Sequence, residues 1–140
     1  MRRAILLVGV ALFMATSIAV SALPALAAVP RVHDMVIRSV TIDPQTKVAT
    51  ARGAVTCTGV ARATVFVDVS QTMGRLHTVT AQGDKDIDCD GRVSFSVRLT
   101  NVEGRLGAGD ARVRADTFTC TQDAFYDDDF KRTIRVTNAQ

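Results

Sequence analysis

A cluster of aspartates before Gly91 is the densest group of possible metal ligands in this 140-residue sequence. The segment Asp86-x-Asp88-x-Asp90-Gly91 imitates the start of a calcium-binding loop, in which oxygen ligands at alternate positions surround one ion. Such a loop also needs a bidentate glutamate at its twelfth position, and this chain has Val97 there. On a β-strand these carboxylates would share one face. We therefore expect a solvated acidic edge and no metal site; the alternative is weak calcium binding by the cluster from Asp84 to Asp90.

Residues that serve in catalysis are otherwise sparse. The two histidines, His33 and His77, have no cysteine or carboxylate at the spacing of a zinc site. No G-x-S-x-G motif occurs, and Ser94 and Ser96 fall within an alternating strand pattern. Glu103 is the single glutamate, so a glycosidase-like carboxylate pair would have to come from aspartates. We predict a protein that is not an enzyme, with no catalytic residues and no cofactor.

An aromatic pair in an acidic loop is the best candidate for a contact site. Phe125 and Tyr126 lie between Asp123 and the run 127–129, which is entirely aspartate. Aromatic side chains in loops are common at protein interfaces. The alternative is that Phe125 or Phe130 packs under the loop and extends the core.

The three cysteines allow one intramolecular disulfide and leave one thiol over. An immunoglobulin pattern would favour Cys57 with Cys120, which joins strands far apart in the sequence. Cys57 with Cys89 is the other pairing considered. A remaining Cys120 would be a buried thiol or a point of intermolecular linkage.

The N-terminal segment has the pattern of a secretory signal peptide. Arg2 and Arg3 supply the positive region, residues 4–20 carry no charge, and Ala25-Leu26-Ala27 is a small-x-small cleavage site. A membrane anchor is the alternative, because the apolar stretch is long enough to cross a bilayer. Pro24 and the cleavage site favour removal. We predict a cleaved helical signal peptide over 1–27 and one secreted, extracellular domain over 28–140, with no stable membrane span after cleavage.

Removal of the signal peptide changes the charge balance of the chain. The formal net charge of the whole sequence is +3. Without Arg2 and Arg3, 15 lysines and arginines face 14 aspartates and glutamates. A nearly neutral domain gives no electrostatic argument for nucleic-acid binding.

Alternation of apolar and polar residues dominates the sequence after residue 31. The clearest run is Arg62 to Ser70, where valines and alanine alternate with Arg, Thr, Phe and Asp. Asp90-Gly91 is a strong hairpin signal between two such runs. No helical periodicity is present in this part of the chain. Seven or eight short strands predict an all-β fold, an immunoglobulin-like antiparallel β-sandwich. The strands are expected near 36–42, 47–59, 62–70, 76–81, 87–89, 93–99, 111–118 and 133–137, with turns at Asp43-Pro44-Gln45, 82–84 and 101–110.

Five short motifs occur along the predicted strands and turns: Val55-Thr56-Cys57-Thr58-Gly59, Val69-Ser70-Gln71, Gly74-Arg75, Cys89-Asp90-Gly91 and Gly109-Asp110-Ala111-x-Val113-x-Ala115. Together they resemble those of a family of small secreted actinobacterial proteins of unknown function with an immunoglobulin-like domain. The resemblance covers most of residues 36–137. It implies a disulfide between Cys57 and Cys89, which we therefore favour, and it places Phe95 where relatives have an aromatic residue, usually Trp.

The resemblance brings no assigned activity. The expected function is non-catalytic binding outside the membrane, with an extracellular protein, a cell-wall component or a small ligand as partner. A small-ligand carrier would need an apolar cleft, whereas a protein-binding module would need an exposed aromatic patch. An enzyme with an unrecognised site would need Asp, His and Ser side chains in one pocket.

Overall fold

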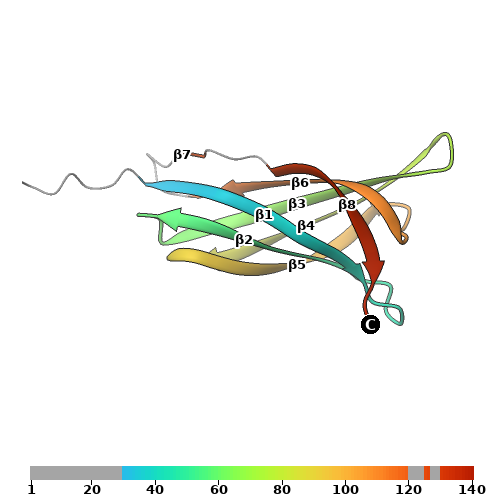
Figure 1. The fold of residues 1–140 in the computed structure, drawn as a ribbon, viewed down its shortest axis with the longest axis horizontal. Coiled ribbons are helices and arrows are strands. Elements are labelled where there is room, and N and C mark those ends of the chain that lie inside the picture. Colours follow the sequence, from blue (N-terminus) through green and yellow to red (C-terminus); the bar gives the residue numbers. More distant parts are fainter. Residues whose placement is uncertain (1–29, 120–124, 127–129) are drawn as a thin grey trace, which may run out of the picture.

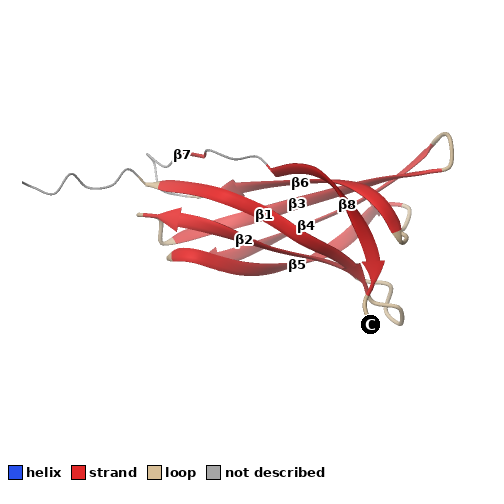
Figure 2. Cartoon of the chain, viewed as in Figure 1, coloured by secondary structure: helices blue, strands red, loops and turns tan. Residues whose placement is uncertain are grey.

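The computed structural model describes residues 30–119, 125–126 and 130–140. Every regular element in these ranges is a β-strand, which confirms the predicted all-β class (Figure 2). The predicted signal peptide, with Ala25 and Ala27, lies outside the described residues and stays a prediction. The strands are β1 (Arg31–Ile42), β2 (Ala49–Thr58), β3 (Arg62–Met73), β4 (His77–Asp88), β5 (Gly91–Glu103), β6 (Gly109–Phe118), β7 (Phe125–Tyr126) and β8 (Phe130–Asn138).

Membrane-spanning helices were also considered. Over the described ranges, no helix has the length and apolar character needed to cross a bilayer.

One continuous sheet contains all eight strands, in the order β2-β5-β4-β3-β6-β8-β1-β7 (Figure 1). An additional pairing of β1 with β2 closes seven of them into a barrel. Neighbours round the barrel are antiparallel except β1 and β8, which are parallel. One parallel pair is unavoidable, because directions cannot alternate round an odd number of strands.

Closure differs from the two separate sheets of the predicted sandwich. One half of the barrel contains β1, β2 and β5, and the other contains β4, β3, β6 and β8. Two short ladders join the halves: Thr80–Gln82 with Thr100–Glu103, and Val40–Ile42 with Val136–Asn138. Alternation along a strand reports which residues face the core, but it carries no information about these corners.

The core consists mainly of valine and alanine from the inward face of each strand. Val65, Val67 and Val69 of β3 are at most 1% exposed. Phe95 is the large side chain opposite Gly53 in the β2–β5 register. A Cβ at Gly53 would lie 2.6 Å from the Phe95 ring and 2.3 Å from the Val36 carbonyl oxygen. Glycine is required here because the aromatic ring and the β1 backbone occupy the space of a side chain.

Two predicted turns lie elsewhere. β4 continues through 82–84, which we expected to end it, and β5 extends to Glu103. The turn that follows β5 is fixed by the buried amide of Gln71. Its Nε2 donates to the Gly107 carbonyl at 3.0 Å, and its Oε1 accepts from the Gly107 N–H at 2.9 Å. This reciprocal pair replaces the backbone bonds that a regular turn would make.

The Asp90-Gly91 turn does not produce the closely paired hairpin that we predicted. β4 and β5 pair only at the ladder far from this turn, and near Asp90 they separate. The end of β4 pairs with β3, whereas Gly91 at the start of β5 pairs with Cys57 of β2. Strand pairing on opposite sides therefore pulls the two arms of the hairpin apart.

A disulfide joins β2 to the chain at this point of separation. Cys57 and Cys89 are bonded, with their Cα atoms 5.6 Å apart. Both residues are buried, and the Cys89 N–H donates to the Ala61 carbonyl at 2.8 Å. This is the pairing that the family resemblance implied, and it leaves no bond between Cys57 and Cys120.

Removing the disulfide tests its contribution to stability. The bond encloses β3 and β4 over a sequence separation of 32 residues. The chain-entropy model assigns a loop of this length about 3–4 kcal/mol. We expect the double variant C57A/C89A to lose about this much free energy of unfolding in urea titration. C120S is the matched control, and an equal loss in C120S would contradict this assignment.

An aspartate fixes the turn between β1 and β2. The Asp43 Oδ1 accepts from the N–H groups of Gln45 at 2.7 Å and Thr46 at 2.9 Å. These bonds, that of Thr46 first, lower the pKa of the Asp43 carboxyl below its ordinary value of 3.8. Lys47 completes the turn with a φ of 60°, in the left-handed region.

The lowered pKa predicts a pH-dependent share of stability. A carboxyl with a depressed folded pKa stabilises the fold above its unfolded pKa, and this contribution is lost as the pH falls through the folded pKa. D43N retains the acceptor oxygen but has no charge. We expect wild type to exceed D43N in stability at neutral pH and to approach it below pH 3.8, measured by urea unfolding. A difference that stays constant into acid would contradict the assignment.

Candidate functional site

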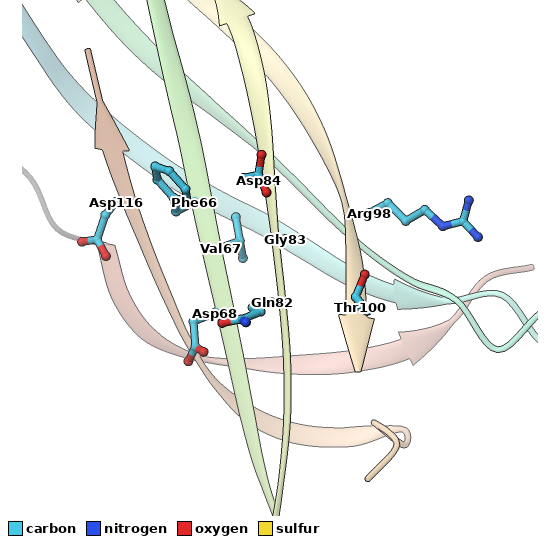
Figure 3. Close-up of a pocket in the computed structure, with 9 residues that line it drawn as sticks. All are labelled: Phe66, Val67, Asp68, Gln82, Gly83, Asp84, Arg98, Thr100 and Asp116. Atoms are coloured by element: carbon cyan, nitrogen blue, oxygen red, sulfur yellow. The ribbon is translucent and has the colours of Figure 1, made fainter. Parts of the chain in front are cut away.

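A groove with a volume of about 540 Å³ lies on the outer face of the sheet. It lies where β4 separates from β5, and β3 and β6 form its other side. We call it the acidic groove. Its lining residues are Phe66, Val67, Asp68, Gln82, Gly83, Asp84, Arg98, Thr100 and Asp116 (Figure 3).

An exposed aromatic ring lies between two carboxylates in this groove. In the strand register, Phe66 of β3 is directly opposite Asp84 of β4 on one side and Asp116 of β6 on the other. Opposed residues of neighbouring antiparallel strands have Cβ atoms about 4.5–5.5 Å apart. Phe66 is 45% exposed, although the inward side chains of the same strand are buried. The row therefore presents an apolar surface with negative charge on both sides.

No cation of the described residues neutralises Asp84 in this row. Arg98 lines the groove, but Figure 3 shows its side chain extending away from Asp84 and Phe66. Among the described residues, no cation forms an ion pair with Asp68 or Asp84. The groove consequently has a negative potential that favours a cationic group.

Gly83 brings β4 close enough to β5 to form the groove. A Cβ on Gly83 would lie 2.2 Å from the carbonyl oxygen of Arg98 and 2.9 Å from Val97 Cγ1. The backbones therefore touch at this position, and only glycine permits the contact. Because β4 diverges from β5 immediately afterwards, Asp84 is placed at the edge of the opening.

A second exposed phenylalanine extends the apolar surface toward the disulfide end of the barrel. Phe118 of β6 is 56% exposed and is directly opposite Thr64, one row along from Phe66. The Thr64 hydroxyl donates to Asp86 Oδ1 at 2.6 Å, which fixes a third carboxylate beside it. We call Phe66 and Phe118, with the carboxylates of Asp84, Asp86 and Asp116, the aromatic strip.

The predicted contact loop is only partly within the described residues. The backbone of Phe125 and Tyr126 forms β7, which runs parallel to Arg31 and Val32 at the start of β1. A contact role for these two side chains stays a prediction. The first residue of β1 also pairs with Thr58, so β7 lies at the disulfide end, the same end as Phe118.

The residues weighed for catalysis do not converge. His33 contacts Asp34 Oδ2 at 2.9 Å and Thr58 Oγ1 at 3.4 Å, at the start of β1. His77 begins β4 at the opposite end of the barrel, beside the β3–β4 turn. Ser94 and Ser96 are exposed on β5. Within the described ranges, no three His, Cys, Asp or Glu residues are placed to hold a metal ion.

The sequence analysis did not predict the acidic groove, although two of the phenylalanines at this surface could have indicated it. Phe66 and Phe118 both occupy the outward phase of strands whose other outward residues are polar or charged. Two exposed phenylalanines near each other on one face form an apolar patch, which is more informative than a single exposed apolar residue. The position of Asp84 and Asp116 beside Phe66 depends on register between three strands, which the sequence does not supply.

A substitution at Gly83 tests the close approach that forms the groove. G83A introduces a methyl group against the Arg98 carbonyl, and overpacking of this kind costs about 1–3 kcal/mol. The matched control is G74A, which has no atom within 4 Å of the new Cβ and strains only its φ of 66°. We expect G83A to lose more stability than G74A in urea unfolding. An equal or smaller loss would show that β4 does not depend on this contact.

Comparison with known proteins gives no functional assignment. No protein-family model matches this sequence, and no curated protein matches it. The function is therefore argued from the groove and the surface around it.

Proposed function

We propose that this chain is an exported, non-catalytic binding module that contacts another protein through the aromatic strip. The observation that carries the proposal is the exposed Phe66 ring between Asp84 and Asp116. Contiguous exposed apolar surface with a polar rim is typical of protein interaction sites.

The charge around Phe66 indicates the chemistry of the partner. An aromatic ring attracts a lysine or arginine cation placed over its face. The Asp84 carboxylate beside the ring adds a charge-assisted hydrogen bond to the same cation. A basic side chain of the partner protein therefore enters the acidic groove, and neighbouring apolar side chains cover Phe118.

Export is part of the proposal. The predicted signal peptide over 1–27 would send residues 28–140 out of the cell, where disulfides persist. The bond between Cys57 and Cys89 is compatible with that location. The division of the barrel into a β1-β2-β5 half and a β4-β3-β6-β8 half supports an immunoglobulin-like relationship with the small secreted actinobacterial proteins that the motifs resemble.

A small-ligand carrier is the second candidate. The groove volume of about 540 Å³ suits a small molecule. Its lining is rich in carboxylates, so it favours a small organic cation over the hydrophobic ligands of an apolar cleft.

Site-specific photo-crosslinking tests which candidate is right. A photoreactive phenylalanine analogue replaces Phe66, or separately Phe118, in the exported chain in its own culture medium and envelope. We expect a covalent adduct with the same protein from both positions. The matched control is Leu76, which is fully exposed at the β3–β4 turn and should give no such adduct.

Quantitative binding of the captured protein completes the test. F66S should weaken binding by about tenfold or more, as expected for an aromatic residue at an interface centre. D84N should weaken it and reduce its salt dependence, whereas L76S should have no effect. Equal adducts from all three positions, or none above background, would contradict the protein-binding proposal. A small cation recovered from the groove by native mass spectrometry would favour the carrier.

A further inference from the structure

A second groove on the same outer face has the opposite charge. It lies over β6 and β8, has a volume of about 410 Å³, and we call it the basic groove. Its lining residues are Arg112, Arg114, Lys131, Arg132 and Thr133, all of them exposed. These residues are spread over two short stretches of sequence, and only the pairing of β6 with β8 brings them together.

The arrangement of these cations is unfavourable without a ligand. In the β6–β8 register, Arg114 is directly opposite Lys131, and like charges in that position repel. Asp68 of β3 is opposite Arg114 on its other side, but no ion pair within 4.0 Å joins them. Over the described residues, no carboxylate forms an ion pair with Arg112, Arg114 or Lys131.

The positive potential is local and does not follow from an overall basic composition. Beyond the predicted signal peptide, the positive and negative residues are nearly equal in number. Three carboxylates, those of Asp84, Asp86 and Asp88, share the outward face of β4, and β3 separates them from the basic groove. On β6 itself, Asp110 and Asp116 lie on either side of Arg112 and Arg114 on the same face.

We propose that the basic groove binds successive phosphate groups of an anionic phosphodiester polymer at the cell surface. Arg112 and Arg114 lie two residues apart on β6, which is about 7 Å along a strand and suits neighbouring phosphates of such a chain. The planar fork of arginine matches the oxygens of a phosphate, and the Thr133 hydroxyl opposite Arg112 adds a donor. Arg132 is opposite the buried Val113, in the other phase of β8 from Lys131 and Thr133, and its guanidinium lies 5.9 Å from the centroid of the Phe130 ring.

A polymer fits this groove better than a membrane surface. The groove lining contains no large apolar side chain. Membrane-surface binding normally combines cations with apolar residues that enter the interface. The exposed large hydrophobic residues of the described chain belong to the aromatic strip or to the β3–β4 and β5–β6 turns.

Binding to synthetic poly(glycerol phosphate), measured by calorimetry with the full exported chain, tests the proposal. We expect binding that weakens with salt and that falls by about tenfold or more in R114Q/K131Q, because two charge-assisted contacts are lost. The matched control R52Q/R92Q removes the same charge from the exposed outer face of β2 and β5 and should bind as wild type. R112K/R114K keeps the charge but loses the forks, and it should bind with intermediate affinity.

Several results would overturn the proposal. These are no measurable binding, equal loss in the two glutamine variants, polyglutamate bound as tightly as poly(glycerol phosphate), or tighter binding to phosphatidylglycerol vesicles than to the polymer. Self-association of wild type that disappears in R114Q/K131Q would identify a second copy as the occupant. F66S should bind the polymer normally, so failure of this site and failure of the protein-binding proposal are distinguishable.

Discussion

The disulfide between Cys57 and Cys89 fixes the point at which β4 and β5 separate, and the outer face of the barrel depends on that separation. The start of β5 pairs with β2 in a continuous ladder from Ala49 opposite Leu99 to Cys57 opposite Gly91. The disulfide joins Cys89 to the end of this ladder, at the point where β4 has turned away to pair with β3. Farther from the Asp90-Gly91 turn, β4 and β5 come together again, and the backbone contact of Gly83 with Arg98 marks where they do so. The acidic groove is the space that this divergence leaves on the outside.

The same face combines two kinds of surface that the overall charge conceals. β3 is a mainly uncharged strip, with Phe66 exposed, between the aspartates of β4 and the cations of β6 and β8. The two grooves adjoin, because Asp68, which lines the acidic groove, is directly opposite Arg114 of the basic groove. A nearly neutral chain can still have two sites of opposite preference. In the proposed function, the acidic groove takes a basic side chain, and the basic groove takes phosphate.

The inward faces of the strands were predictable because burial imposes a period of two. Val65, Val67 and Val69 were assigned to one face from the sequence, and all three are in the core. The pairing of strands was much harder to predict. The closure of β1 onto both β2 and β8 depends on register shifts near His33–Val36 and Ile37–Ser39, and Asp34 has a φ of 54° there. The sequence does not reveal that a residue other than glycine will adopt this left-handed backbone conformation.

Turn-forming residues in the sequence predicted one turn correctly and another wrongly. Asp43-Pro44 was identified as a turn, and the structure has Asp43 accepting two backbone N–H groups there. Gln82-Gly83 has similar turn-forming residues, yet β4 continues through it because Gly83 serves contact with β5. The candidate site was likewise only partly predictable, because some of its residues share a strand and others meet only through strand pairing. Exposed phenylalanines at outward positions were visible in the sequence, but the aspartates beside Phe66 come from other strands.

The parallel pairing of β1 with β8 has a mechanical consequence. Parallel strands leave the start of β1 and the end of β8 at opposite ends of the barrel, as Figure 1 shows. Tension between the two ends of the domain would pull these strands past each other, so the hydrogen bonds at Val40–Ile42 would share the load. Bonds loaded in shear must break together, whereas bonds peeled from one end break in turn. If the domain were held at one end and bound to a partner at the other, the parallel β1–β8 ladder would therefore carry the tension and oppose unfolding.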